Sequence, residues 1–181
     1  GTATGELIVW RADTLEEVKL LSGSPAGIIN VGFSPDGRLL AVLFNKPSIA
    51  IWEVAKWRKI YDVSLILSGN YQYHSLVFSP DNKWLRIAAK VFLSLSNGQV
   101  KDYPTLDWFE GAAAISPEGS RFLDVTSGRR ACFNRLTWPG NFFHSSTAYC
   151  EKDAHRIVGR AATFSPDGRL AATGADDIVL W

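Results

Sequence analysis

The sequence contains no methionine, only two cysteines and no long apolar run. No stretch reaches the roughly 18 apolar residues of a membrane-spanning helix, so we expect no such helix. Its 19 basic and 18 acidic residues leave a net charge of +1, which gives no reason to expect nucleic acid or an acidic membrane as a partner. Because the chain begins at Gly1 and has no methionine, we expect that its natural start lies elsewhere.

The two cysteines, Cys132 and Cys150, leave two interpretations open. The simpler one is a pair of small buried thiols, because free cysteine behaves as a small apolar residue in protein interiors. The alternative is a disulfide between neighbouring strands, which would suggest an oxidising compartment. We expect the thiols, and two cysteines alone do not identify the compartment.

The rest of the composition is that of a soluble globular protein. Apolar residues make up 46% of the 181 residues and charged residues 20%, which argues against disorder. A chain of this length can form one domain with a sizeable core. Seven Trp, ten Phe and five Tyr favour strands over helices, because aromatic side chains fit the half-buried surface of a sheet.

A five-residue turn pattern occurs four times, with its serines at positions 34, 79, 116 and 165. Proline presets the backbone for a type I turn, and the serine and the acidic residue can hydrogen-bond the local backbone. We expect the final Gly or Asn to take the left-handed conformation. The four copies are Phe33-Ser34-Pro35-Asp36-Gly37, Phe78-Ser79-Pro80-Asp81-Asn82, Ile115-Ser116-Pro117-Glu118-Gly119 and Phe164-Ser165-Pro166-Asp167-Gly168.

Apolar runs flank every copy, so each turn reads as the corner of a β-hairpin. Repeats of about 40 residues that hold several short strands are typical of propeller blades. We therefore predict an all-β chain of four-stranded antiparallel blades in a β-propeller. The expected blades are 25–66, 67–107 and 108–153, with partial blades at 1–24 and 154–181 and the outer strand of the fourth blade within 142–149.

The turns, together with strands that end in tryptophan, resemble the WD-repeat family of β-propellers. The strand endings are Ile8-Val9-Trp10, Ile49-Ala50-Ile51-Trp52 and Ile178-Val179-Leu180-Trp181. The chain departs from the family pattern because Arg11 and Glu53 follow two of these tryptophans in place of Asp. It also lacks the Gly-His pair. The resemblance implies a protein-interaction scaffold.

Three arrangements of the ring remain open. The chain can be a segment of a longer propeller, or two chains can join in an eight-bladed ring as a homodimer. The third arrangement is closure by one chain with four blades. An unclosed ring exposes apolar strand edges, which favour aggregation, so we do not expect isolated monomers.

The sequence shows no catalytic constellation. Ser22-Gly23-Ser24 lacks the pattern of a nucleophile elbow and is interpreted as a loop between blades. The three histidines, His74, His144 and His155, lack metal-ligand spacing with cysteine or carboxylate. No glycine-rich phosphate loop is present. We therefore predict no enzyme activity, cofactor or metal.

We predict a partner-binding face formed by the loops that join blades. Clustered aromatic and arginine side chains are typical of interaction hot spots. The alternative for the aromatic residues is that they wedge between blades. A second hypothesis for function is a sensor or gating propeller of a larger enzyme, a peptidase or a nucleotide-driven switch. We expect a cytoplasmic protein. The predicted partner-binding residues are Tyr71, Tyr73, Trp108, Phe109, Arg129 and Arg130.

Overall fold

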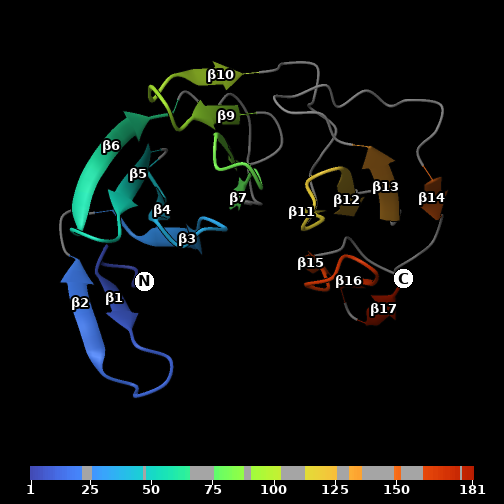
Figure 1. Ribbon diagram of the computed structural model, residues 1–181, viewed down its shortest axis with the longest axis horizontal. Coiled ribbons are helices and arrows are strands. Elements are labelled where there is room, and N and C mark those ends of the chain that lie inside the picture. Colours follow the sequence, from blue (N-terminus) through green and yellow to red (C-terminus); the bar gives the residue numbers. More distant parts are fainter. Residues whose placement is uncertain are drawn as a thin grey trace. The chain divides into compact units, whose positions relative to one another are not determined.

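The computed structural model contains only β-strands and turns in the part of the chain that it describes (Figure 1). No helix long and apolar enough to cross a membrane is found there. The chain divides into two compact units, residues 1–70 and 71–181, which are taken in turn below. The described residues are 1–21, 26–46, 48–65, 76–87, 91–102, 113–125, 131–135, 149–151, 161–175 and 177–181.

The first unit holds a two-stranded hairpin followed by a four-stranded antiparallel sheet in which each strand pairs with the next along the chain. We name these sheet A and sheet B. Sheet A comprises β1 (Leu7–Trp10) and β2 (Glu17–Leu21), and sheet B comprises β3 (Ile28–Phe33), β4 (Leu39–Phe44), β5 (Ser48–Glu53) and β6 (Arg58–Ser64).

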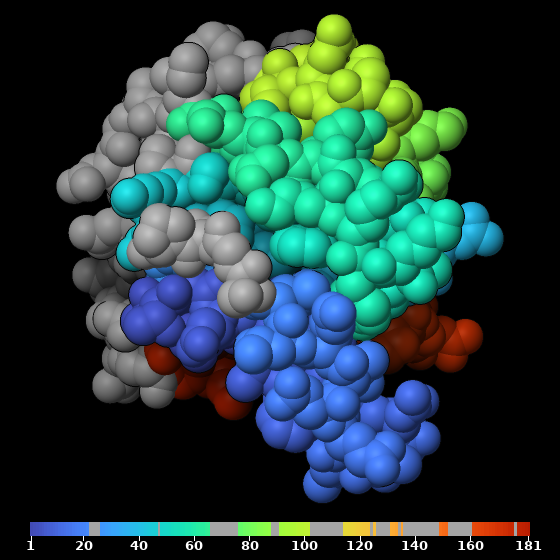
Figure 2. All heavy atoms as spheres, turned by 90° about the vertical axis from the view of Figure 1, so that its left-hand side faces the viewer, coloured from blue at the N-terminus to red at the C-terminus, as the bar shows by residue number. Residues whose placement is uncertain are grey.

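Sheet A packs one of its faces against sheet B. Leu7 and Leu21, opposite each other in the hairpin, join a buried cluster with Leu40, Val42 and Ala50 of sheet B. The end of the hairpin is open to solvent: Leu15, in the turn, is 75% exposed. Figure 2 shows this end (blue) extending beyond sheet B (cyan to teal). The core of the first unit therefore lies between the base of the hairpin and the inner strands of sheet B.

The second unit holds three further antiparallel sheets with the same consecutive strand order. We name them sheets C, D and E. Sheet C comprises β7 (Leu76–Phe78), β8 (Trp84–Ile87), β9 (Val91–Ser94) and β10 (Val100–Asp102). Sheet D comprises β11 (Ala113–Ile115), β12 (Arg121–Val125), β13 (Ala131–Arg135) and β14 (Tyr149–Glu151). Sheet E comprises β15 (Ala161–Phe164), β16 (Ala171–Gly174) and β17 (Ile178–Leu180).

Aromatic rings join sheet D to sheet E. The Phe133 ring centroid lies 6.5 Å from that of Phe164 and 5.7 Å from that of Trp181, both edge to face. This is the arrangement that aromatic quadrupoles favour. Leu123 and Ala171 are buried in the same cluster. A cation–π contact joins sheet C to sheet D. The Cζ of the buried Arg86 lies 4.4 Å from the Phe122 ring centroid.

The expected position of the outer strand of sheet D needs correction. The sequence predicts that strand within 142–149, whereas β14 runs from Tyr149 to Glu151. All three of its residues are exposed, so it lacks the alternation of apolar and polar residues that identifies a half-buried strand. A strand of this kind carries no hydrophobic signal in the sequence.

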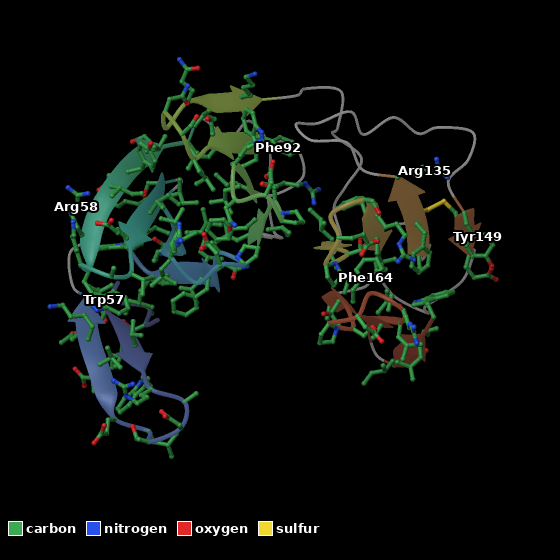
Figure 3. All side chains as sticks on the ribbon, viewed as in Figure 1. Trp57, Arg58, Phe92, Arg135, Tyr149 and Phe164 are labelled. Atoms are coloured by element: carbon green, nitrogen blue, oxygen red, sulfur yellow. A yellow bond between two sulfur atoms is a disulfide. The ribbon has the colours of Figure 1, made fainter. Side chains whose placement is uncertain are left out.

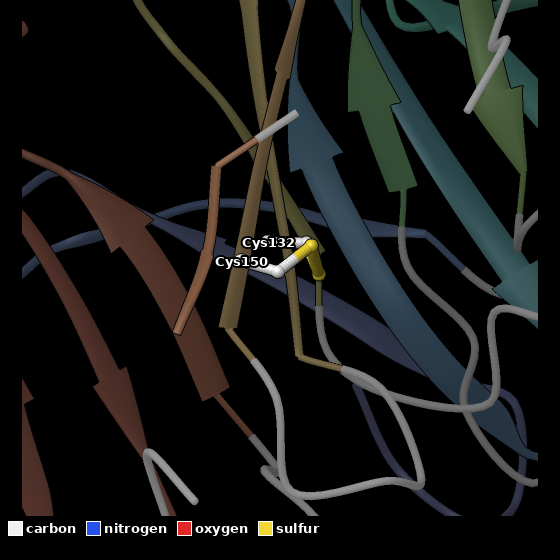
Figure 4. The surroundings of a disulfide bond; sticks show 2 residues. All are labelled: Cys132 and Cys150. Carbon is white, nitrogen blue, oxygen red and sulfur yellow. A yellow bond between two sulfur atoms is a disulfide. The ribbon is translucent and has the colours of Figure 1, made fainter. Parts of the chain in front are cut away.

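The expectation of two free thiols is wrong. Cys132 of β13 and Cys150 of β14 lie directly opposite each other, with their Cα atoms 4.1 Å apart, and form a disulfide (Figure 4). Cys132 is buried, as expected, but Cys150 is exposed on the outer strand. The predicted range of the outer strand, 142–149, does not include Cys150. The sequence prediction therefore does not place the two cysteines opposite each other.

Candidate interaction surface

The four repeated turns share one local structure, in which the serine hydroxyl organises the corner. Ser79 donates from its Oγ to Asp81 Oδ1 at 2.6 Å and accepts from the backbone N–H of Trp84 at 2.9 Å. The backbone N–H of Asn82 donates to the Ser79 carbonyl at 2.9 Å and closes the turn. Ser34 and Ser165 make the same bonds with Asp36 and Asp167. The turns are therefore fixed by side chains as well as by backbone.

The left-handed position ends each turn as predicted. Its φ is +69° at Gly37, +55° at Asn82, +74° at Gly119 and +69° at Gly168. Glycine takes this conformation without penalty, and Asn is the residue that tolerates it best after glycine. The sequence pattern thus identified the backbone conformation at all four corners.

In the second unit the three turns lie against one another. A Cβ built on Gly119 would come within 2.5 Å of Pro80 Cγ, from the turn before it. A Cβ on Gly168 would come within 2.9 Å of Glu118 Oε2 and 3.4 Å of Pro117 Cδ. The preceding turn therefore packs into the space that a side chain would occupy at each of these glycines. We call this contact the seating of one turn on the glycine of the next. We call this set the turn row and define it as residues 79–83, 116–121 and 165–169.

Arg121 fastens the last two turns of the row. Its Nε donates to Glu118 Oε1 at 2.9 Å, and its Nη2 donates to the Gly168 carbonyl at 2.9 Å. Its guanidinium also lies 6.0 Å from the Phe164 ring centroid; Figure 3 shows Phe164 on sheet E. One side chain thus binds an acidic group within its own turn and a carbonyl and a ring of the next sheet.

The acidic side chains of the turns stay ionised well into the acid range. Hydrogen bonds from its own backbone N–H and from Arg121 lower the pKa of Glu118 to about 2. The Ser34 hydroxyl lowers the pKa of Asp36, and the Ser165 hydroxyl lowers that of Asp167. At Asp81 burial opposes the shift, but the Ser79 hydroxyl and the Lys83 backbone N–H still lower the pKa. The turn row therefore carries fixed negative charges.

Basic side chains alternate with these charges and are exposed. The Lys83 side chain is 73% exposed and lies 3.6 Å from Asp81, and Arg169 is exposed beside Asp167. Exposed pairs of this kind add little to stability. The row presents exposed side chains of both charge signs, with one proline in each turn. It contains no nucleophile paired with a base.

The predicted partner-binding residues Tyr71, Tyr73, Trp108, Phe109, Arg129 and Arg130 all lie outside the described residues. The same is true of the Ser22-Gly23-Ser24 loop and of the three histidines. Among the residues that the structure does describe, no group of three or more His, Cys, Asp or Glu is placed to hold a metal ion. The turn row was not predicted as a surface, although the four sequence repeats were the signal that locates it.

A side-chain hydrogen bond joins Trp181, at the end of sheet E, to strand β16. The indole Nε1 of Trp181 donates to the hydroxyl of the buried Thr173 at 3.0 Å. The strand-ending tryptophan singled out in the sequence therefore has a polar partner as well as aromatic neighbours.

Comparison with known proteins agrees with this architecture. No protein-family model matches the chain. The small ribosomal subunit protein RACK1z of Arabidopsis thaliana is 33% identical over 70 residues, which is 39% of this chain and 20% of RACK1z. The crystal structure of the β-propeller domain of Cps50 (Swd1) from Myceliophteria thermophila matches with a TM-score of 0.78 at 15% identity. That match covers 99% of this chain and 60% of the Swd1 chain.

The chain thus spans about a fifth of RACK1z and 60% of the Swd1 propeller chain. The likeness in fold extends over almost the whole of it, and the likeness in sequence over a shorter stretch. The consecutive antiparallel sheets agree with the match to the Swd1 β-propeller. The fold of this chain is that of a β-propeller.

Proposed function

We propose that this chain is a non-catalytic protein-interaction scaffold and that a protein or peptide partner docks on the turn row. The observation that carries the proposal is the seating of each turn on the glycine of the next, which keeps exposed charges in fixed positions. A surface fixed in this way loses little conformational freedom when a partner binds, which favours affinity.

The pattern of charge supports a partner with both signs of charge. Asp81 and Lys83 alternate along one turn, and Asp167 and Arg169 repeat the arrangement on another. Complementary charges at the rim of an interface contribute mainly to specificity and to the association rate. We therefore expect binding to weaken as salt concentration rises, because exposed charges are screened.

Selection from a phage-displayed random peptide library on the immobilised full chain tests this function. We expect an enriched peptide family whose affinity falls at least about tenfold when Lys83 and Arg169 are both changed to Glu. Arg38→Glu is the matched control, since Arg38 holds the same turn position in the first unit and its side chain is 85% exposed. Equal binding by the double variant, or equal loss in the control, would remove the turn row as the docking surface.

A second surface remains a prediction from the sequence. Tyr71, Tyr73, Trp108, Phe109, Arg129 and Arg130 are proposed to hold a partner on the loops that join blades. Replacement of Tyr73, Trp108 and Arg130 with alanine tests this directly. If the enriched peptides bind this triple variant as tightly as the unchanged chain, the loop residues take no part.

A sensor or gating propeller within a larger enzyme is the second candidate function. The fold is compatible with it, because a propeller fold does not by itself define a function. The full reading frame discriminates the two candidates, because a hydrolase or nucleotide-binding domain beside the propeller would favour the second. A cytoplasmic location and a homodimeric ring are further proposals, tested by fractionation of cells and by the mass of the particle in solution.

A further inference from the structure

We propose that the Cys132–Cys150 disulfide is a redox latch that holds β14 on sheet D. This role is separate from the docking of a partner on the turn row. In the disulfide form β14 is the outermost strand of the sheet. Reduction by a low-molecular-weight thiol releases the strand, and β13 becomes the open edge. β14 is short and exposed, the disulfide ties it to β13, and Cys150 is exposed.

β14 has little else to hold it. It spans Tyr149–Glu151, all three residues are exposed, and among the strands that the structure describes it pairs with β13 alone. β6, in the corresponding place in sheet B, spans seven residues and has Ile60, Tyr61 and Val63 partly buried. The side chain of Tyr149 donates to Glu151 on the same strand at 2.7 Å and lies at the outside of the sheet (Figure 3). Apolar burial therefore contributes little to fixing β14.

The connection to β14 is also long. Residues 136–148 separate it from β13, whereas residues 95–99 separate β10 from β9 in sheet C. β10 has three residues, like β14, but follows a tight turn closed by the Gly98 N–H bond to the Ser94 carbonyl. A longer connection costs more conformational entropy to close. The disulfide, at the middle of the three paired positions, offsets that cost.

The two cysteines differ in exposure, and this difference decides which sulfur an external thiolate attacks. Cys150 is exposed, whereas Cys132 is 8% exposed. A thiolate of a dithiol attacks Cys150 Sγ, the Cys132–Cys150 bond breaks, and Cys132 leaves as a thiolate that takes up a proton. The dithiol is now joined to Cys150 in a mixed disulfide. Its second thiol, as the thiolate, attacks the reductant sulfur of that mixed disulfide. Cys150 is released as a thiol and the reductant becomes a cyclic disulfide, so two electrons pass to the protein.

A disulfide in this setting is suited to regulation. This step rests on the proposed cytoplasmic location, because disulfides in a reducing compartment are usually transient and serve catalysis or redox sensing. Accessible disulfides also exchange with thiols more readily. Release converts β13 from an inner strand into an edge with unpaired backbone groups, and such an edge can accept another strand.

Hydrogen exchange of the full chain with and without dithiothreitol tests the latch. We expect amide protection at residues 149–151 to fall on the order of 100-fold on reduction, from the loop-closure entropy of an 18-residue separation. Protection at β13 should fall with it, while β10 serves as the internal control and keeps its protection. Removal of the reductant should restore the oxidised pattern.

Cys132→Ala/Cys150→Ala is the matched variant and should show the reduced pattern with or without dithiothreitol. Alkylation before reduction should label neither cysteine in the unchanged chain. Three outcomes would overturn the proposal: both cysteines alkylated without reductant, unchanged protection at 149–151, or loss of protection throughout sheets C and D. Since the unchanged chain supplies these outcomes, the test does not depend on whether the variant folds.

Discussion

The seating of Pro80 on Gly119 predicts that one added methyl group has very different effects at two glycines of the same turn type. Gly37 and Gly119 share the left-handed conformation, with φ of +69° and +74°. A Cβ at Gly37 would meet nothing within 4 Å, whereas a Cβ at Gly119 would come within 2.5 Å of Pro80 Cγ and 2.7 Å of Pro80 Cδ. Comparison of Gly37→Ala with Gly119→Ala therefore separates backbone strain from contact between turns.

The magnitudes follow from two terms. Left-handed backbone costs an L-residue roughly 1–2 kcal/mol, and the loss of unfolded-state freedom on replacing glycine offsets about 0.4–1 kcal/mol of it. Gly37→Ala should thus lower the free energy of unfolding by about 0.5–1 kcal/mol. Gly119→Ala adds the cost of overpacking against a rigid proline ring, roughly 1–3 kcal/mol. Its total should be about 1.5–4 kcal/mol.

Urea unfolding followed by tryptophan fluorescence measures both changes. With a slope of roughly 2 kcal/mol per molar urea, the midpoint should fall by about 0.3–0.5 M for Gly37→Ala and about 0.8–2 M for Gly119→Ala. Pro80→Ala in the Gly119→Ala background should recover part of the loss, because the clashing ring is removed. Equal midpoints for the two glycine variants, or no recovery in the double variant, would refute the contact between turns.

The remaining predictions concern the turn row and the ends of the hairpins. Arg121→Ala should lower the free energy of unfolding, measured in urea, by about 1 kcal/mol, because it removes charged hydrogen bonds at a half-exposed position. Arg169→Ala is the control and should change the free energy of unfolding little, because Arg169 is exposed. Glu118→Gln should flatten the fall in Tm between pH 4.5 and pH 2, because the low pKa makes the carboxylate stabilising above pH 4.5 and that contribution is lost as pH falls toward about 2; an unchanged profile by circular dichroism would contradict this. Leu15→Gly should raise Tm by about 1–2 °C, since Leu15 has φ of +58° and is 75% exposed. Trp57→Gly should lower Tm, because Trp57 has φ of +50° but packs on the buried cluster of the first unit; the same sign for both would contradict the reasoning.

Strand positions could be predicted from the sequence wherever a turn and an apolar run both marked them. The corner at Asn82 shows the strength of the turn signal, because its left-handed backbone was expected although the other copies have glycine. The outer strand of sheet D could not be predicted, since Tyr149–Glu151 buries nothing. The disulfide was missed for the same reason, because its second cysteine lies on that strand.

The candidate surface was only partly visible in the sequence. The turn pattern predicts the left-handed φ of the residue that ends each turn, because φ depends on the local sequence. The second role of the glycine, as the seat for Pro80 or Glu118 of the preceding turn, joins residues far apart in the sequence and requires the arrangement of neighbouring sheets. The aromatic and arginine loop residues singled out in the sequence fall outside the described residues, so their part in binding remains a prediction.

A nuclear Overhauser measurement between turns tests the central claim most directly. The account predicts strong cross-peaks from the Pro80 ring protons to the Gly119 α-protons and from the Pro117 δ-protons to the Gly168 α-protons, because only close approach explains the space denied to a Cβ at both glycines. Cross-peaks confined to residues within each turn would contradict it, since the turns would then be independent hairpin corners rather than one continuous row.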